Sequence, residues 1–175
     1  MQVIEHYEVP SGGVSEIVFD DIPDTFTDLM LVYSLRSDRA SDLDVLFISF
    51  NNVSSGYSRR QLRGTGSTVA SDTGDTAQFN VYGLNGATST ANTFSNGAMY
   101  VPNYTSSNSK SVSIDDAYEN NGTTAWQAIT AGVWANSAAV TSIKLVMLFG
   151  TEFVEYSSAT LYGILAGSDG TTAVS

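Results

Sequence analysis

The sequence predicts an all-β protein, an antiparallel two-sheet β-sandwich of jelly-roll type, on three observations. No segment keeps apolar residues at i, i+3, i+4 and i+7 for long enough to form an extended amphipathic helix. Short runs rich in β-branched and aromatic residues recur instead, separated by Asn-Gly, Ser-Gly and Gly-Gly pairs. Several runs are apolar on both faces, which is typical of strands in stacked sheets.

The strands are expected to follow one another at short spacing, each bounded by turn residues. Asn85-Gly86, Asn96-Gly97 and Asn121-Gly122 are turn signals because both residue types tolerate the positive φ of tight hairpins. Further turns are expected at 11–13, 23–24, 55–56 and 168–170. The predicted strands are 3–9, 15–19, 28–36, 43–50, 57–62, 78–84, 98–101, 111–117, 124–134, 139–149 and 159–165.

Residues 1–175 are expected to form a single β-sandwich domain. The length of 175 residues suits one core, and no internal repeat or linker divides it. Segment 64–75, rich in Gly, Ser, Thr and Asp, is predicted to be a long exposed loop.

The charge and composition exclude several classes of function. Eighteen acidic residues against seven Lys and Arg give a formal charge of −11, which repels phosphate backbones, so nucleic acid is not an expected partner. The chain has no Cys, and no membrane span or secretion signal is recognisable in it. Only 14% of residues are charged, and a surface of Ser, Thr and Asn costs less to cover with another protein than a charged one.

Two stretches without any charged residue, 76–109 and 120–143, carry a set of aromatic residues. Depletion of charge together with enrichment of aromatics is typical of the core of a protein interface. The alternative is that these stretches are inner strands of the sandwich. The candidate interface aromatics are Phe79, Tyr82, Phe94, Tyr100, Tyr104, Trp126 and Trp134.

A basic group completes the candidate interface. Arg59, Arg60 and Arg63 fall in one predicted strand, where successive side chains point to opposite faces. They are able to pair within the chain, with its acidic first third, or with a neighbouring copy. The sequence favours pairing within the chain.

No residue is predicted to be catalytic or to bind a cofactor or metal. His6 is the only imidazole, and no GxSxG motif accompanies it. The carboxylates of pairs such as Asp42/Asp44 and Asp115/Asp116 match no metal-binding motif and are expected to serve turns on a solvated rim. We therefore expect a protein that is not an enzyme.

The chain resembles small virion proteins of tailed bacteriophages over nearly its whole length. The resemblance rests on the segment IVFDDIPDTFTDLMLVYSLRS at 17–37 and on FISFNN at 47–52. It extends to TSIKL at 141–145, Phe153 and the terminal LYGI at 161–164. The turn at 149–152 departs from the Gly- and Asn-rich turn usual in that family.

The resemblance implies a β-sandwich structural protein of the virion, assembled in the host cytoplasm. Because the first predicted strand begins at Val3 and no stalk or coiled-coil heptad is present, a capsid decoration protein is favoured over a fibre. Its expected partners are other copies of itself, with a trimer as one arrangement, and the major capsid protein or another virion protein. The alternative is a collar, tail or fibre adhesin in which an aromatic side chain stacks on host glycan, with the candidates Tyr57, Tyr82, Tyr100, Tyr104, Trp126 and Trp134.

Overall fold

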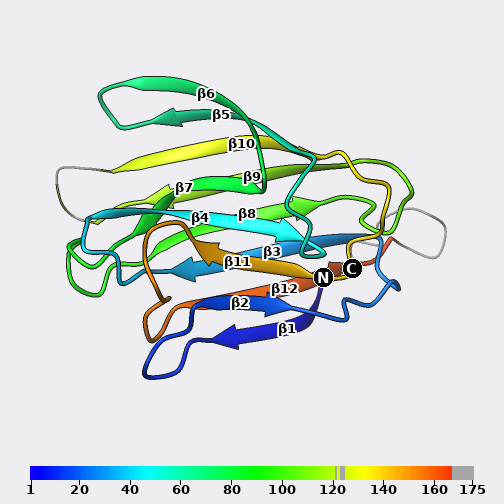
Figure 1. Cartoon of the computed structure of the whole chain (residues 1–175), viewed down its shortest axis with the longest axis horizontal. Coiled ribbons are helices and arrows are strands. Elements are labelled where there is room, and N and C mark those ends of the chain that lie inside the picture. Colours follow the sequence, from blue (N-terminus) through cyan, green and yellow to red (C-terminus); the bar gives the residue numbers. More distant parts are fainter. Residues whose placement is uncertain (121, 123–124, 167–175) are drawn as a thin grey trace.

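An eight-stranded and a four-stranded antiparallel sheet pack face to face in the computed structural model (Figure 1). The structure describes residues 1–120, 122 and 125–166. No helix among these residues is long and apolar enough to cross a membrane. The large sheet has the order β1-β12-β3-β8-β9-β10-β5-β6, and the small sheet has the order β2-β11-β4-β7. The strands are β1 Gln2–Glu8, β2 Glu16–Phe19, β3 Asp28–Leu35, β4 Leu43–Phe50, β5 Tyr57–Gly64, β6 Val69–Thr76, β7 Phe79–Asn85, β8 Ser95–Val101, β9 Lys110–Tyr118, β10 Trp126–Trp134, β11 Ile143–Met147 and β12 Ser158–Ile164.

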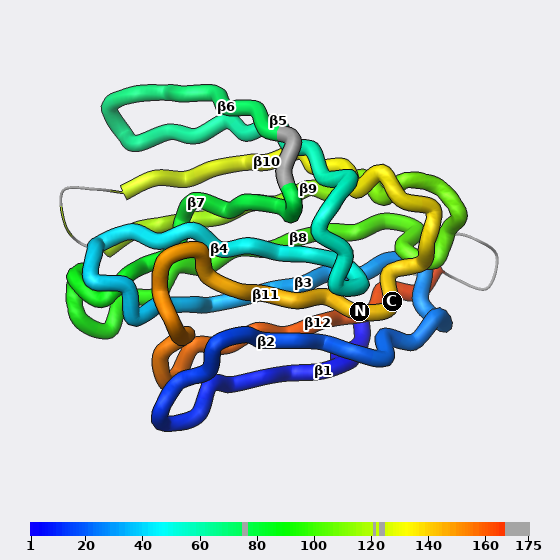
Figure 2. The backbone as a smooth tube through the Cα atoms, viewed as in Figure 1, coloured from blue at the N-terminus to red at the C-terminus, as the bar shows by residue number. Residues whose placement is uncertain are grey.

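The topology is a jelly roll enlarged by two hairpins. Eight strands form two four-stranded layers, β1-β12-β3-β8 and β2-β11-β4-β7, and the chain crosses repeatedly between them. The β5–β6 hairpin is inserted between β4 and β7, and the β9–β10 hairpin is inserted between β8 and β11. Both hairpins join the large sheet, through the pairing of β9 with β8 and of β5 with β10. Figure 2 shows the β5–β6 hairpin at the edge of the molecule farthest from β1.

The predicted fold class is confirmed, and the predicted strands recur with ends shifted by a few residues. Segment 64–75 was predicted wrongly as a loop: most of it forms β6, which pairs with β5 along its whole length. The chain reverses at Gly66-Ser67, where Gly66 has a φ of 84° and the Thr65 N–H donates to the Thr68 carbonyl at 2.9 Å. A Gly-Ser pair between two strands is a hairpin signal that the sequence carries.

The turn expected at Asn96-Gly97 is also wrong, because both residues lie inside β8. Gly97 is required there for a close approach: a Cβ at this position would overlap the Tyr33 hydroxyl oxygen. The glycine therefore makes room for a side chain from β3. The turn expected at 168–170 lies outside the described residues, as do residues 121, 123 and 124 of the predicted turn and strand nearby.

Four aromatic side chains attach the inserted hairpins to the jelly roll. Phe50 and Phe79 come from the small sheet, and Tyr57 and Trp134 come from β5 and β10. The rings of Tyr57 and Phe79 lie 4.9 Å apart, and those of Phe50 and Trp134 lie 5.5 Å apart, both edge to face. The four side chains are buried, so the cluster removes a large apolar area from water and fixes β5 and β10 to the small sheet.

We expect Gly97→Ala to lower the free energy of unfolding by about 1 to 3 kcal/mol, because the added methyl group forces Tyr33 and the backbone of β9 apart. Chemical denaturation measures the change. Gly64→Ala in β5 is the matched control, since no heavy atom lies within 4 Å of the added Cβ. Equal stability of the two variants would contradict this account of Gly97.

A candidate assembly surface on the large sheet

The outward face of the large sheet carries mostly uncharged side chains. Alternate residues of each strand point away from the small sheet, and the strand register aligns them in rows. One row contains Val32, Ala98, Asp115, Ile129 and Leu62, in the spatial order of β3, β8, β9, β10 and β5. Ile129 is 57% exposed and Leu62 is 48% exposed, so this row presents apolar side chains to solvent.

The adjacent row gives the surface its shape. It contains Met30, Tyr100, Ser113, Ala131 and Arg60, in the same order of strands. The short side chains Ala98, Ser113 and Ala131 lie on β8, β9 and β10. Longer side chains on β3 and β5 flank them on both sides. A groove of about 620 Å³ results, which runs over the centre of the sheet.

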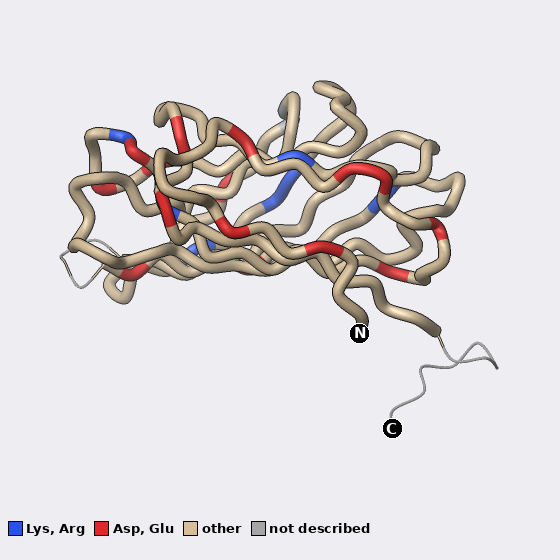
Figure 3. Tube along the Cα trace, turned by 90° about the horizontal axis from the view of Figure 1, so that it is seen from below, with Lys and Arg blue, Asp and Glu red and all other residues tan. Residues whose placement is uncertain are grey.

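The face holds few ionised groups although the chain is strongly acidic. Among the outward side chains of β3, β8, β9, β10 and β5, only Asp28, Arg60 and Asp115 are charged. Asp28 lies at the start of β3, where its carboxylate accepts hydrogen bonds from the Tyr100 hydroxyl and the Asn103 N–H, both at 2.8 Å. Figure 3 shows the two sheets edge-on, with acidic positions distributed over much of the molecule. The strong negative charge of the chain is therefore largely absent from these five strands of the outward face.

The predicted interface aromatics divide between core and surface. Phe79, Tyr104 and Trp134 are fully buried in the hydrophobic core, so their prediction as interface residues is wrong for this chain. Phe79 and Trp134 lie in inner strands, as the alternative interpretation held, and Tyr104 is buried in the turn between β8 and β9. Tyr82, Phe94, Tyr100 and Trp126 are partly exposed, and of these only Tyr100 lines the groove.

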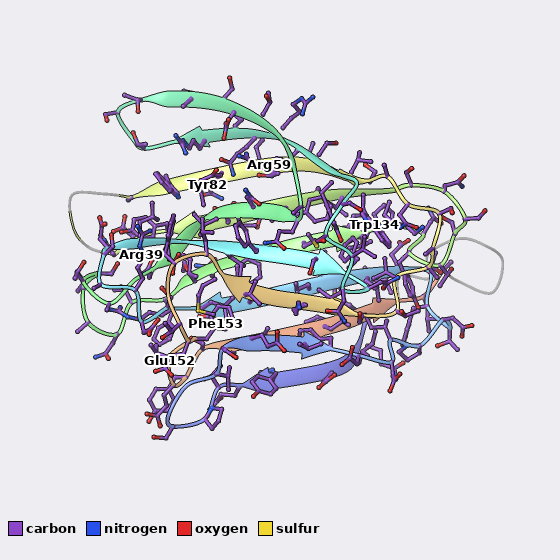
Figure 4. All side chains as sticks on the ribbon, in the orientation of Figure 1. Arg39, Arg59, Tyr82, Trp134, Glu152 and Phe153 are labelled. Carbon is purple, nitrogen blue, oxygen red and sulfur yellow. The ribbon has the colours of Figure 1, made fainter. Side chains whose placement is uncertain are left out.

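The three predicted arginines do not act as a group. Arg59 is buried, donates to the Asp72 carboxylate at 2.7 Å and lies over the Tyr82 ring (Figure 4). The hydrogen bond from Arg59 holds the pKa of Asp72 below its usual value. Arg63 lies over the Trp126 ring, and Arg60 points outward beside the groove.

Pairing of Arg59 within the chain is thus correct, but the expected partner is not. The carboxylate belongs to β6, across the β5–β6 hairpin, rather than to the acidic first third of the chain. The hairpin places the two side chains on the same face of adjacent strands, and this was hidden once β6 was taken as a loop.

The two adjacent carboxylates Asp115 and Asp116 lie in the middle of β9 and not in a turn, contrary to expectation. Because successive side chains of a strand alternate, Asp115 is exposed and Asp116 points into the sandwich, where it is 1% exposed. Neither oxygen of Asp116 has a hydrogen-bond partner among the described residues, and the Trp126 indole N–H and Tyr33 hydroxyl are unpaired as well. Burial, followed by the negative charge of Asp115, raises the pKa of Asp116 to about 7.

The geometry offers no cluster of groups suited to catalysis or metal binding in the described part of the chain. Asp115 and Asp116 face opposite sides of a sheet, so they do not act on one substrate. The described residues contain no group of three or more His, Asp or Glu side chains able to hold a metal ion. His6 is exposed on β1, and its Nδ1 lies 2.8 Å from the Thr160 hydroxyl.

The outward face, with its exposed apolar row and few charges, is therefore the candidate site for contact with a partner. No protein-family model, curated protein or solved structure matches the chain. An apolar, weakly charged and grooved sheet face is suited to contact with another protein surface.

We expect the free energy of unfolding to fall as the pH rises from about 4 to about 7. The folded state holds a proton on Asp116 in this range, whereas the unfolded chain releases it near the ordinary pKa of 3.8. The slope approaches about 1.4 kcal/mol per pH unit, and Asp116→Asn abolishes it.

Urea denaturation of both proteins over this pH range measures the effect. Asp115→Asn is the control: it removes a carboxylate from the adjacent, exposed position and is expected to keep most of the slope. A parallel pH profile for the wild type and Asp116→Asn would show that Asp116 is ionised in the folded protein.

Proposed function

We propose that this protein is a non-enzymatic structural protein of a tailed-bacteriophage virion, a capsid decoration protein that assembles through the outward face of its large sheet. The observation that carries the proposal is the exposed row of Val32, Ile129 and Leu62 on a face with so few charges. The resemblance of segments 17–37 and 141–164 to phage virion proteins supplies the setting.

The physical argument is the low cost of covering this face. Side chains such as Ser113, Ala98 and Ala131 lose little hydration and little conformational freedom when a partner covers them. Exposed aliphatic groups beside them gain about 25 cal/mol for each Å² removed from water. Many identical copies on one particle turn modest individual contacts into stable attachment.

The alternative, an adhesin for host glycan, has weaker support in the same geometry. Of the aromatics considered for stacking on sugar, Tyr57, Tyr104 and Trp134 are buried. Tyr100 alone lines the groove, and its hydroxyl already donates to Asp28. The aliphatic Ile129 and Leu62 suit a protein surface better than a sugar.

The proposal is tested with phage particles that lack this protein because its gene is deleted from the genome. Purified protein is added to these particles and its binding is measured. Purified wild-type protein is expected to bind in many copies over the shell, measured by co-sedimentation and electron microscopy. Ile129→Asp is expected to weaken binding at least about tenfold, since a carboxylate must then be buried at the contact.

Leu148→Asp is the matched control, because Leu148 is 43% exposed but follows β11 of the small sheet. It is expected to bind like the wild type. Absence of binding to the shell would contradict a decoration role. Binding only at the tail, together with binding to host polysaccharide, would establish the adhesin instead.

A further inference from the structure

We propose that the outward face is covered by a second copy of the chain, in a two-fold dimer in which Arg60 of each copy pairs with Asp115 of the other. The inference rests on the proposed function and makes the partner at this surface a second copy of the protein, so that dimers bind the shell and loss of the contact at Ile129 weakens attachment by removing the second copy. Its support comes from the placement of the charges and from the apolar side chains that lie beside them.

The charges lie where a two-fold axis pairs them. Arg60 is on β5 and Asp115 is on β9, on either side of β10, in adjacent rows of the face. The midpoint between them falls over β10, between Ile129 and Ala131. An axis through this point, perpendicular to the line from Arg60 to Asp115, places each charge opposite its counterpart in the partner.

Neither charge is neutralised by the other within one copy. No ion pair joins Arg60 to Asp115 in the described part of the chain, and both side chains are exposed. One Arg60 Nη1–H donates to the Arg59 carbonyl at 2.7 Å, which leaves further donors of the guanidinium for a carboxylate. Two such pairs per dimer offset the only charges at the centre of the face.

The same axis brings apolar groups together. Ile129 and Leu62 are neighbours in one row and lie close to the axis. Ile129 of each copy therefore meets Leu62 of the other copy. The shorter Ser113 and Ala131 also meet near the axis, which allows the two sheets to approach closely. An apolar centre flanked by two ion pairs suits an isologous contact.

The area of the contact is that of a small interface. An axis over β10 brings only the five strands from β8 to β6 of the two copies face to face, and at about 4.8 Å spacing and about 20 Å in length these present on the order of 500 Å² on each copy. A total of about 1,000 Å² corresponds to a weak, reversible dimer. Asp28, Arg60 and Asp115 leave the central strands with a net charge of only −1, so little of the repulsion between two copies acts across this face.

Sedimentation velocity tests the dimer on the full-length protein. The wild type is expected to dimerise, and Arg60→Glu and Asp115→Arg are each expected to weaken dimerisation at least about tenfold, because like charges then meet twice. An equimolar mixture of the two variants is expected to recover the dimer, since every contact again joins opposite charges. The double variant is expected to recover it as well.

Lys144→Glu is the matched control for Arg60→Glu, because it makes the same change in net charge on the small sheet. It is expected to leave the dimer unchanged, and thermal unfolding confirms that each variant folds. A wild type that stays monomeric, or variants that fail to complement each other, would overturn the dimer. If the protein stays monomeric but still binds particles in a way that depends on Ile129, the proposed function stands and only the dimer is excluded. If the protein forms the charge-dependent dimer but does not bind particles, the dimer stands and the proposed function is excluded.

Discussion

The large sheet depends on the packing of Phe50, Tyr57, Phe79 and Trp134. A jelly roll covers four strands of each layer, and additional strands at one edge would expose both of their faces to water. The aromatic cluster covers the inner side of β5 and β10, and the Tyr57 hydroxyl accepts a hydrogen bond from the Phe50 N–H at 2.8 Å. Only with these strands held in place does the outward face become wide enough to act as a binding surface.

The two faces of the inserted strands differ in chemistry because the aromatic cluster covers only the inner face. On the inner side, Arg59 is paired with Asp72, and burial raises the pKa of Asp116, which favours its neutral form. On the outer side, one residue along the chain, Asp115 and Arg60 stay charged in water. Strand alternation therefore separates a structural pair of charges from a pair free to bind a partner.

Much of this organisation could be predicted from the sequence, because strand periodicity and turn residues are local signals. The pattern at 43–50 gave the bounds of β4 directly. The prediction for segment 64–75 failed because its composition is typical of a loop, whereas its pairing with β5 decides its structure. Trp134 was misassigned for a related reason: absence of charge marks both a core and an interface, and only the second sheet distinguishes them.

The candidate site could not be predicted from the sequence, because it depends on the register in which β5, β10 and β9 pair. The sequence placed Arg60 and Asp115 far apart and grouped each with its immediate neighbours, Arg59 and Asp116. Pairing of β5 and β9 with opposite sides of β10 brings the two onto one face and turns their neighbours inward. In a protein of charge −11, two copies repel over most of their surfaces, so the nearly neutral face is where they can meet. A single opposite pair on that face then fixes the orientation of contact, because a rotated arrangement leaves Arg60 and Asp115 without counterparts.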